Sequence, residues 1–327
     1  QQVLAFFSPN TEILTFPAWD TMPYDRASPK PAIMAERMKV ISRLSATESD
    51  TKPRIILTTA NAILQKLPPR ESICNVEFIV KNGEKLKPDV LFSYLSTQGY
   101  RRVGKSMESG EFSLRGGIID IIPSGMSEGV RIDLFGDTVE SLRLFDPLTQ
   151  ISSLSIDKLE LLPISEVLLS EENIARFRAG YRDHFGAVSR EDPLYESISQ
   201  GTNYVSMEHF LPLFYERVDS LLDYCGNTLI TIDNEAQASI KERQESILDY
   251  YEARKTAVST TSRNNSFASG GIYNPIPPDS FFIMKDAWER ILETRDNLTF
   301  SPFGEDSSVA SISLNRRPSL RFIQGQA

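Results

Sequence analysis

The sequence has 327 residues, of which 40% are hydrophobic and 24% are charged, and its formal net charge at pH 7 is −9. The length predicts two or three domains, and the composition is ordinary for a globular protein. No apolar run approaches the ~18 residues that span a bilayer, which excludes a membrane-spanning helix and a membrane partner. The acidic balance argues against broad electrostatic binding of nucleic acid, because such binders carry a basic face, although a local basic patch stays possible.

The residues that bind metals or form disulfides are few. Cys74 and Cys225 lie far apart, and the two histidines, His184 and His209, form no H-E-x-x-H motif. We therefore expect no bound metal, no zinc protease and no disulfide framework, which suits the reducing cytoplasm. The chain begins with neither Met nor a basic leader, so we expect a piece of a longer protein without a signal peptide.

The first 80 residues alternate predicted strands and helices. Buried strands are predicted over 12–16 and 54–58, and an amphipathic helix lies between them, since apolar residues recur there at helical spacing. Thr59 is expected to cap a short helix over 61–67 that Pro68-Pro69 ends. This order is typical of a parallel α/β sheet.

The next region is predicted to be a small, mostly β domain. A helix over 88–98 ends at Gly99, and four glycine-containing turns then separate short strands. Polar and apolar residues alternate over 130–135 and 139–145, which predicts half-exposed antiparallel strands. Arg131, Asp133 and Arg143 are expected on the outer face of that sheet, either solvated or paired with one another.

Helical patterns return after residue 163. We predict a helix over 171–185, a buried strand over 227–233, a long polar helix from 235 to about 254, and a loop or linker over 258–271.

One segment fits a phosphate-binding motif. Residues 99–106 (G-Y-R-R-V-G-K-S) match G-x-x-x-x-G-K-[ST] position for position. A P-loop needs a strand before it and a helix after it, whereas here a helix precedes and a β-hairpin follows. We therefore interpret the match as accidental.

Other catalytic arrangements are weak. Asp233-Asn234-Glu235 ends a predicted strand, and it is either a degraded magnesium-binding acidic motif or a cap of the following helix. His209 lacks a nucleophile elbow and is expected to be a packed or surface residue, and Asp20 and Asp25 are expected in a solvated, proline-rich loop. We predict no catalytic residue and no bound cofactor.

The β-rich region carries a resemblance. The run G-E-F-S-L-R-G-G-I-I-D-I-I-P at 110–123, with the strands over 130–137 and 140–149, resembles domain 2 of the excision-repair protein UvrB. The transcription-repair coupling factors share this block. Two further segments resemble coupling factors in particular: F-P-A-W-D-T-M-P-Y-D at 16–25 and E-H-F-L-P-L-F at 208–214. UvrB also carries a long DNA-inserting aromatic hairpin after the first of these segments, and here only 26–31 intervene.

The resemblance implies the fold class and the domain limits. It implies an α/β protein with a degenerate helicase-like parallel domain 1A over 1–80, an inserted mostly-β domain 2 over 81–160, and a mixed α/β domain 1B over 161–327. In the family such a module has lost its ATPase motifs and recruits UvrA. RNA polymerase and DNA are bound by other domains, where ATP and magnesium are expected.

The same resemblance selects residues for UvrA binding. Arg101, Arg102 and Arg115 match basic positions that the family uses against UvrA, and Phe112 is expected to add an apolar contact. A guanidinium can bind a carboxylate through two hydrogen bonds, so arginines suit an acidic partner surface. Two alternatives stay open: a UvrB-type fragment that binds damaged DNA directly, and a nucleotide-binding ATPase.

Overall fold

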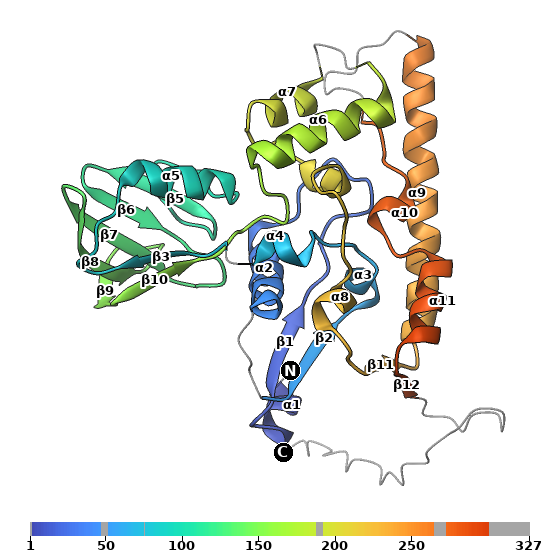
Figure 1. Cartoon of the computed structure of the whole chain (residues 1–327), viewed down its shortest axis with the longest axis horizontal. Coiled ribbons are helices and arrows are strands. Elements are labelled where there is room, and N and C mark those ends of the chain that lie inside the picture. Colours follow the sequence, from blue (N-terminus) through green and yellow to red (C-terminus); the bar gives the residue numbers. More distant parts are fainter. Residues whose placement is uncertain (1, 47–51, 75, 188–191, 265–272, 301–327) are drawn as a thin grey trace, which may run out of the picture.

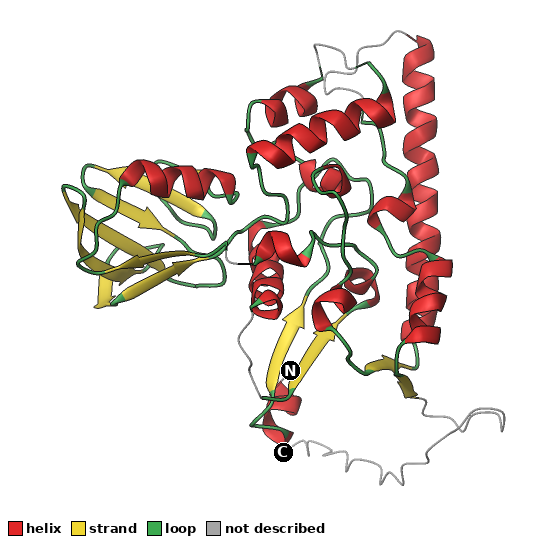
Figure 2. Ribbon diagram, viewed as in Figure 1, coloured by secondary structure: helices red, strands yellow, loops and turns green. Residues whose placement is uncertain are grey.

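A computed structural model of the chain describes residues 2–46, 52–74, 76–187, 192–264 and 273–300. Figure 1 shows a β-rich lobe beside a larger, mainly helical body that contains two short sheets. The secondary-structure view in Figure 2 shows the same separation: most strands lie in the lobe and most helices lie in the body. The described chain is therefore mixed α/β with several sheets.

The first sheet of the body is the predicted parallel pair. Strands β1 (Glu12–Phe16) and β2 (Arg54–Thr58) pair in parallel, and helix α2 (Pro31–Ser45) lies between them in the chain. The apolar side of α2 packs against Phe16, which is fully buried. Helices α1 (Gln2–Phe7), α4 (Arg70–Ile73) and α8 (Leu221–Cys225) complete this part of the body.

Helix α3 (Ala60–Ile63) begins at the predicted cap but is shorter than predicted. The Thr59 hydroxyl accepts the N–H of Ala62 at 3.3 Å. The helix ends early because the following residues leave it for bridges to other segments: Gln65 pairs with Phe282, and Leu67 with Asp219.

The β-rich lobe contains a six-stranded sheet in sequence order. Its strands are β4 (Arg101–Arg102), β5 (Glu111–Arg115), β6 (Ile118–Ile121), β7 (Gly129–Phe135), β8 (Thr138–Phe145) and β9 (Ser152–Ser155). Only β4 and β5 run parallel. A separate antiparallel pair, β3 (Phe78–Lys81) with β10 (Lys158–Leu161), and helix α5 (Pro88–Thr97) belong to the same lobe. The four predicted turns are confirmed, since Gly110, Gly116, Gly125 and Gly136 all have positive φ.

The sheet buries one face against α5. Side chains of the inner face, such as Ile119 and Ile132, pack with Leu91 and Leu95 of the helix in one apolar core. Alternation along each strand places the intervening polar residues on the opposite, outer face.

A close approach of backbone and ring in this lobe gives a first prediction. Gly129 is the register partner of Phe145, and a Cβ at position 129 would lie 2.2 Å from the buried Phe145 ring. We expect Gly129→Ala to lower the free energy of unfolding by about 1–3 kcal/mol through overpacking. Urea unfolding of that variant beside Gly104→Ala, whose Cβ would meet nothing within 4 Å, checks it. Equal stability of the two variants would contradict it.

The remaining helices form most of the body. They are α6 (Glu171–Phe185), α7 (Pro193–Ser199), the 3-10 helix η1 (Met207–Leu213), α9 (Ala236–Asn264), α10 (Pro278–Phe281) and α11 (Lys285–Thr294). The limits of α6 are as predicted. The linker predicted from residue 258 is wrong as far as residue 264, because α9 continues to that point. The Ser/Thr-rich composition there is compatible with a helix, and the rest of that prediction lies outside the described residues.

The body also contains a second pair of parallel strands. Strand β11 (Ile230–Asp233), shorter than the predicted 227–233, pairs with β12 (Asn297–Phe300). Ile230 and Ile232 are buried and pack with Trp288 of α11. In the described part of the chain, no helix combines the length and apolar character that a membrane crossing requires.

Candidate partner-binding surface

The outer face of the six-stranded sheet is a ladder of charged side chains. The strand register places Asp120, Arg131 and Arg143 on neighbouring strands. Arg131 binds Asp120 through two hydrogen bonds of 2.7 and 2.9 Å, and this contact raises the pKa of the guanidinium. Asp133 and Arg143 pair with each other as expected, whereas Arg131 pairs with Asp120, which lies outside the predicted set.

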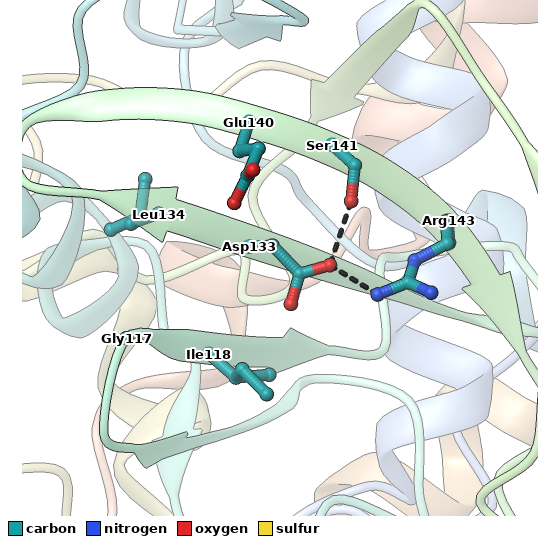
Figure 3. A pocket seen from close by; sticks show the side chains of 7 residues that line it. All are labelled: Gly117, Ile118, Asp133, Leu134, Glu140, Ser141 and Arg143. Carbon is teal, nitrogen blue, oxygen red and sulfur yellow. Dashed lines mark hydrogen bonds and ion pairs between the residues drawn. The ribbon is translucent and has the colours of Figure 1, made fainter.

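The outer face contains a hollow of about 530 Å³, which lies within the roughly 300–1,000 Å³ that is typical of ligand pockets. Its lining residues are Gly117, Ile118, Asp133, Leu134, Glu140, Ser141 and Arg143. In Figure 3 the Asp133 carboxylate accepts hydrogen bonds from the Arg143 guanidinium and the Ser141 hydroxyl. Burial raises the pKa of Asp133, but these two contacts outweigh it and hold the pKa below its ordinary value. The Glu140 side chain lies at the same hollow and is exposed.

Arg115 is the strand neighbour of a residue that lines this hollow. It ends β5, just before the turn at Gly116-Gly117, and its register partner Ile118 lines the hollow. The Arg115 side chain is exposed and has no ion pair among the described residues. Its guanidinium is therefore available for a carboxylate from outside the chain.

Arg101 already forms an ion pair with a residue of the same sheet. Its guanidinium lies 2.5 Å from Oε1 of Glu111, and the other carboxylate oxygen of Glu111, Oε2, accepts the N–H groups of Met107 and Glu108. Burial raises the pKa of Glu111, but the two backbone hydrogen bonds and Arg101 together bring it below its ordinary value. Arg101 is thus already paired, unlike Arg115.

Phe112 does not lie on the surface, which corrects the expectation of a partner contact by its ring. The side chain is 2% exposed and belongs to the inner-face core. It packs nearly parallel to Phe92 at 5.8 Å, and the Arg102 guanidinium lies over the Phe92 ring, also at 5.8 Å. Since Arg102 and Phe112 are register partners, both lie on the α5 side of the sheet. Phe112 therefore supports the ring under Arg102.

The four predicted residues thus do not form one cluster. Arg101 and Arg115 share a face with the hollow, whereas Arg102 lies at the sheet edge beside α5. Two exposed apolar residues of the sheet were not predicted: Ile118, the register partner of Arg115, and Phe135 at the end of β7, which is 80% exposed. The signal for Ile118 was present, because residues that flank a two-residue hairpin turn share a face of the sheet.

The P-loop-like segment has the context that its sequence predicted. Helix α5 precedes it, strand β4 lies within it, and no helix follows it before β5. The Ser106 hydroxyl is fully buried and donates to the carbonyl of Asp120 at 3.1 Å, so it is used by the fold.

The other candidate groups also have structural partners. His209 is 3% exposed and its ring nitrogen lies 3.2 Å from the Ala27 carbonyl. Asp20 pairs with Lys30 at 3.3 Å, and Asp233 accepts the N–H of Asn234. Among the residues that the structure describes, no group of His, Cys, Asp and Glu could hold a metal ion.

Comparison with known proteins finds a family match for the β-rich lobe. Residues 78–166 match the family model described as the UvrB interaction domain. Beyond the lobe, the chain is 34% identical over 321 residues to a transcription-repair-coupling factor of Rickettsia prowazekii, an alignment that covers 98% of the chain. The chain is homologous to the N-terminal region of transcription-repair-coupling factors. The coupling factor of Escherichia coli is 29% identical over 244 residues, which is 74% of the chain.

The coupling-factor alignments cover only part of the relatives. The chain spans 27% of the Rickettsia prowazekii protein and 21% of the Escherichia coli protein. Within that part, the coupling-factor-like segment 16–25 is structural: Tyr24 is buried at a positive φ of 59°, and Trp19 lies edge-on to His209 at 5.4 Å. On the outer face of the lobe, in contrast, Arg115 is exposed and has no ion pair among the described residues.

Proposed function

We propose that the chain is a non-catalytic, UvrB-like module that recruits UvrA to stalled RNA polymerase in transcription-coupled nucleotide excision repair. The observation that carries the proposal is the match of residues 78–166 to the UvrB interaction domain. Arg115 and Arg102 of that lobe are exposed and have no ion pair among the described residues, so an acidic surface of UvrA would supply their partners.

The proposal assigns the remaining tasks to other parts of a longer protein. Contacts with RNA polymerase and DNA, and any use of ATP and magnesium, would belong there. The helicase-like ancestry and the domain limits 1–80, 81–160 and 161–327 stay predictions, supported by the parallel pair β1–β2 and by the separate core of the lobe.

Binding to purified UvrA tests the proposal. We expect titration calorimetry to detect binding by the parent chain, and Arg115→Glu and Arg102→Glu each to weaken it by about thirtyfold, or about 2 kcal/mol, as expected for an interface hot spot. Arg101→Gln should cost less, because Glu111 already binds that guanidinium.

A matched control separates the surface from net charge. Arg178→Glu makes the same charge change on an exposed position of α6 in the body, and we expect it to leave UvrA binding unchanged. Circular dichroism should show that every variant keeps the parent fold. No binding by the parent, or equal losses in Arg178→Glu and Arg115→Glu, would refute the proposal. Salt-sensitive DNA binding by a parent chain that ignores UvrA would favour the damaged-DNA alternative.

A further inference from the structure

A second pocket lies in the body, between the start of α3 and one face of α9. Its volume is about 440 Å³. The residues that line it are Thr59, Ala60, Asn61, Ser239, Glu242, Arg243 and Ser246. All but Ala60 carry polar side chains, and the four from α9 recur at helical spacing, so they share one side of that helix. This pocket has no part in the proposed binding of UvrA, which concerns the β-rich lobe.

Arg243 is the unusual member of the lining. Its Nε is fully buried and has no hydrogen-bond partner among the described residues. Among the described residues no ion pair involves Arg243, whereas on the same helix Lys241 pairs with Glu245 and Lys255 with Glu252. Burial lowers the pKa of the guanidinium, so the surroundings disfavour its charge. An arginine nevertheless stays protonated, and a partly buried charge without a counter-ion is costly.

The other lining groups limit what could supply that counter-ion. The Thr59 hydroxyl accepts the N–H of Ala62, which leaves its own hydrogen free to donate. The Glu242 carboxylate also lines the pocket and would repel a bare anion. A ligand that combines a phosphate with nearby hydroxyl or amino donors suits both charges, because Arg243 can bind the phosphate while Glu242 accepts from the donors.

We propose that the pocket between α3 and α9 binds the phosphate of a nucleotide unit, with Arg243 as the phosphate ligand. A volume of about 440 Å³ lies in the range of small-molecule sites. The same chemistry is offered by a free nucleotide and by a nucleotide within a single strand of DNA. The phosphate site is independent of residues 99–106, whose P-loop-like sequence lies in the other lobe.

Thermal unfolding of the whole 327-residue chain tests the proposal with three probes: inorganic phosphate, adenosine monophosphate and an oligothymidylate. We expect a nucleotide-containing probe to raise the melting temperature, and Arg243→Gln to weaken its binding about tenfold or more. A shift by the monophosphate but not the oligonucleotide would assign a free nucleotide. A shift by the oligonucleotide that disappears with salt would assign a nucleic acid strand.

A control variant and the ligand-free protein keep the test decisive. Lys241→Gln removes the same charge from an exposed position of α9 outside the pocket, and should bind each probe as the parent does. Without ligand, Arg243→Gln should melt no lower than the parent, since it removes an uncompensated charge. Failure of all three probes to shift the parent, or unchanged binding by Arg243→Gln, would overturn the proposal. UvrA binding by Arg243→Gln should equal that of the parent, so the two proposals fail separately.

Discussion

Replacing Arg37 by Met is expected to lower the free energy of unfolding by about 3–5 kcal/mol. Arg37 on α2 and Glu166 form a fully buried ion pair, and the second contact of the pair, Nη2 to Oε2, is 3.4 Å long. Arg37 also donates to the carbonyl of Pro17 at 2.8 Å, and its guanidinium lies 4.2 Å from the centre of the Phe16 ring. The substitution leaves the Glu166 carboxylate buried without a counter-ion.

The pair also joins the two parts of the molecule. Residues 161–169 leave strand β10 and enter the body: Leu161 and Ile164 belong to the core of the lobe, while Val167 and Leu168 belong to cores of the body. Glu166 lies between them, and its carbonyl accepts the Tyr215 hydroxyl at 2.8 Å. Loss of the pair is therefore expected to weaken the attachment of this segment as well as α2.

Urea unfolding followed by circular dichroism measures the effect. Arg43→Met, on the same helix, breaks a partly exposed pair with Glu12 and should cost about 1 kcal/mol or less. The double variant Arg37→Met/Glu166→Leu should be more stable than Arg37→Met alone, because it removes the stranded charge. A loss for Arg37→Met no larger than that for Arg43→Met would show that the buried pair does not have this role.

Local signals explain which parts of the fold were predictable. The parallel strands, α6 and the turns of the lobe follow from short-range patterns: β-branched runs, helical spacing and glycines that need positive φ. Contacts between distant residues leave no such trace. Arg37 and Glu166 are separated by 129 positions, and β12 pairs with β11 from the far end of the described chain.

The candidate surface shows the same division. Alternation along β7 and β8 correctly placed Arg131, Asp133 and Arg143 on the outer face. It could not show that Arg101 already has a partner in Glu111. The burial of Phe112 depends on helix α5 covering that face, where Phe92 packs against its ring. The assignment of Arg102 and Arg115 to UvrA binding stays a prediction until binding is measured.

The adjacent residues Glu208 and His209 on η1 lead to an opposite pair of pH effects. Burial raises the pKa of Glu208 to about 7 from an ordinary 4.5, and the Ser28 hydroxyl, which donates to its carboxylate at 2.7 Å, offsets only part of this. Burial lowers the pKa of His209 to about 4 from 6.5. Between pH 4.5 and 7 the folded state keeps the Glu208 proton that the unfolded state loses, so Glu208 lowers stability as pH rises. His209 acts in the reverse sense between pH 4 and 6.5, because there the unfolded state binds the extra proton.

The effects of the two groups on the free energy of unfolding therefore oppose each other in the parent. A variant that lacks one group should show the pH dependence that the group contributes. Relative to the parent at the same pH, Glu208→Gln should gain about 3 kcal/mol of unfolding free energy between pH 4.5 and 7, since it lacks the destabilising ionisation. His209→Gln should lose a similar amount between pH 4 and 6.5. Comparing each variant with the parent in urea across this range removes the contribution of all other titrating groups. A difference from the parent that stays constant with pH would show that the group does not titrate as its burial requires. Slopes of opposite sign would establish that a half-buried acid and a buried base, adjacent in sequence, change the stability of the fold in opposite directions as pH rises.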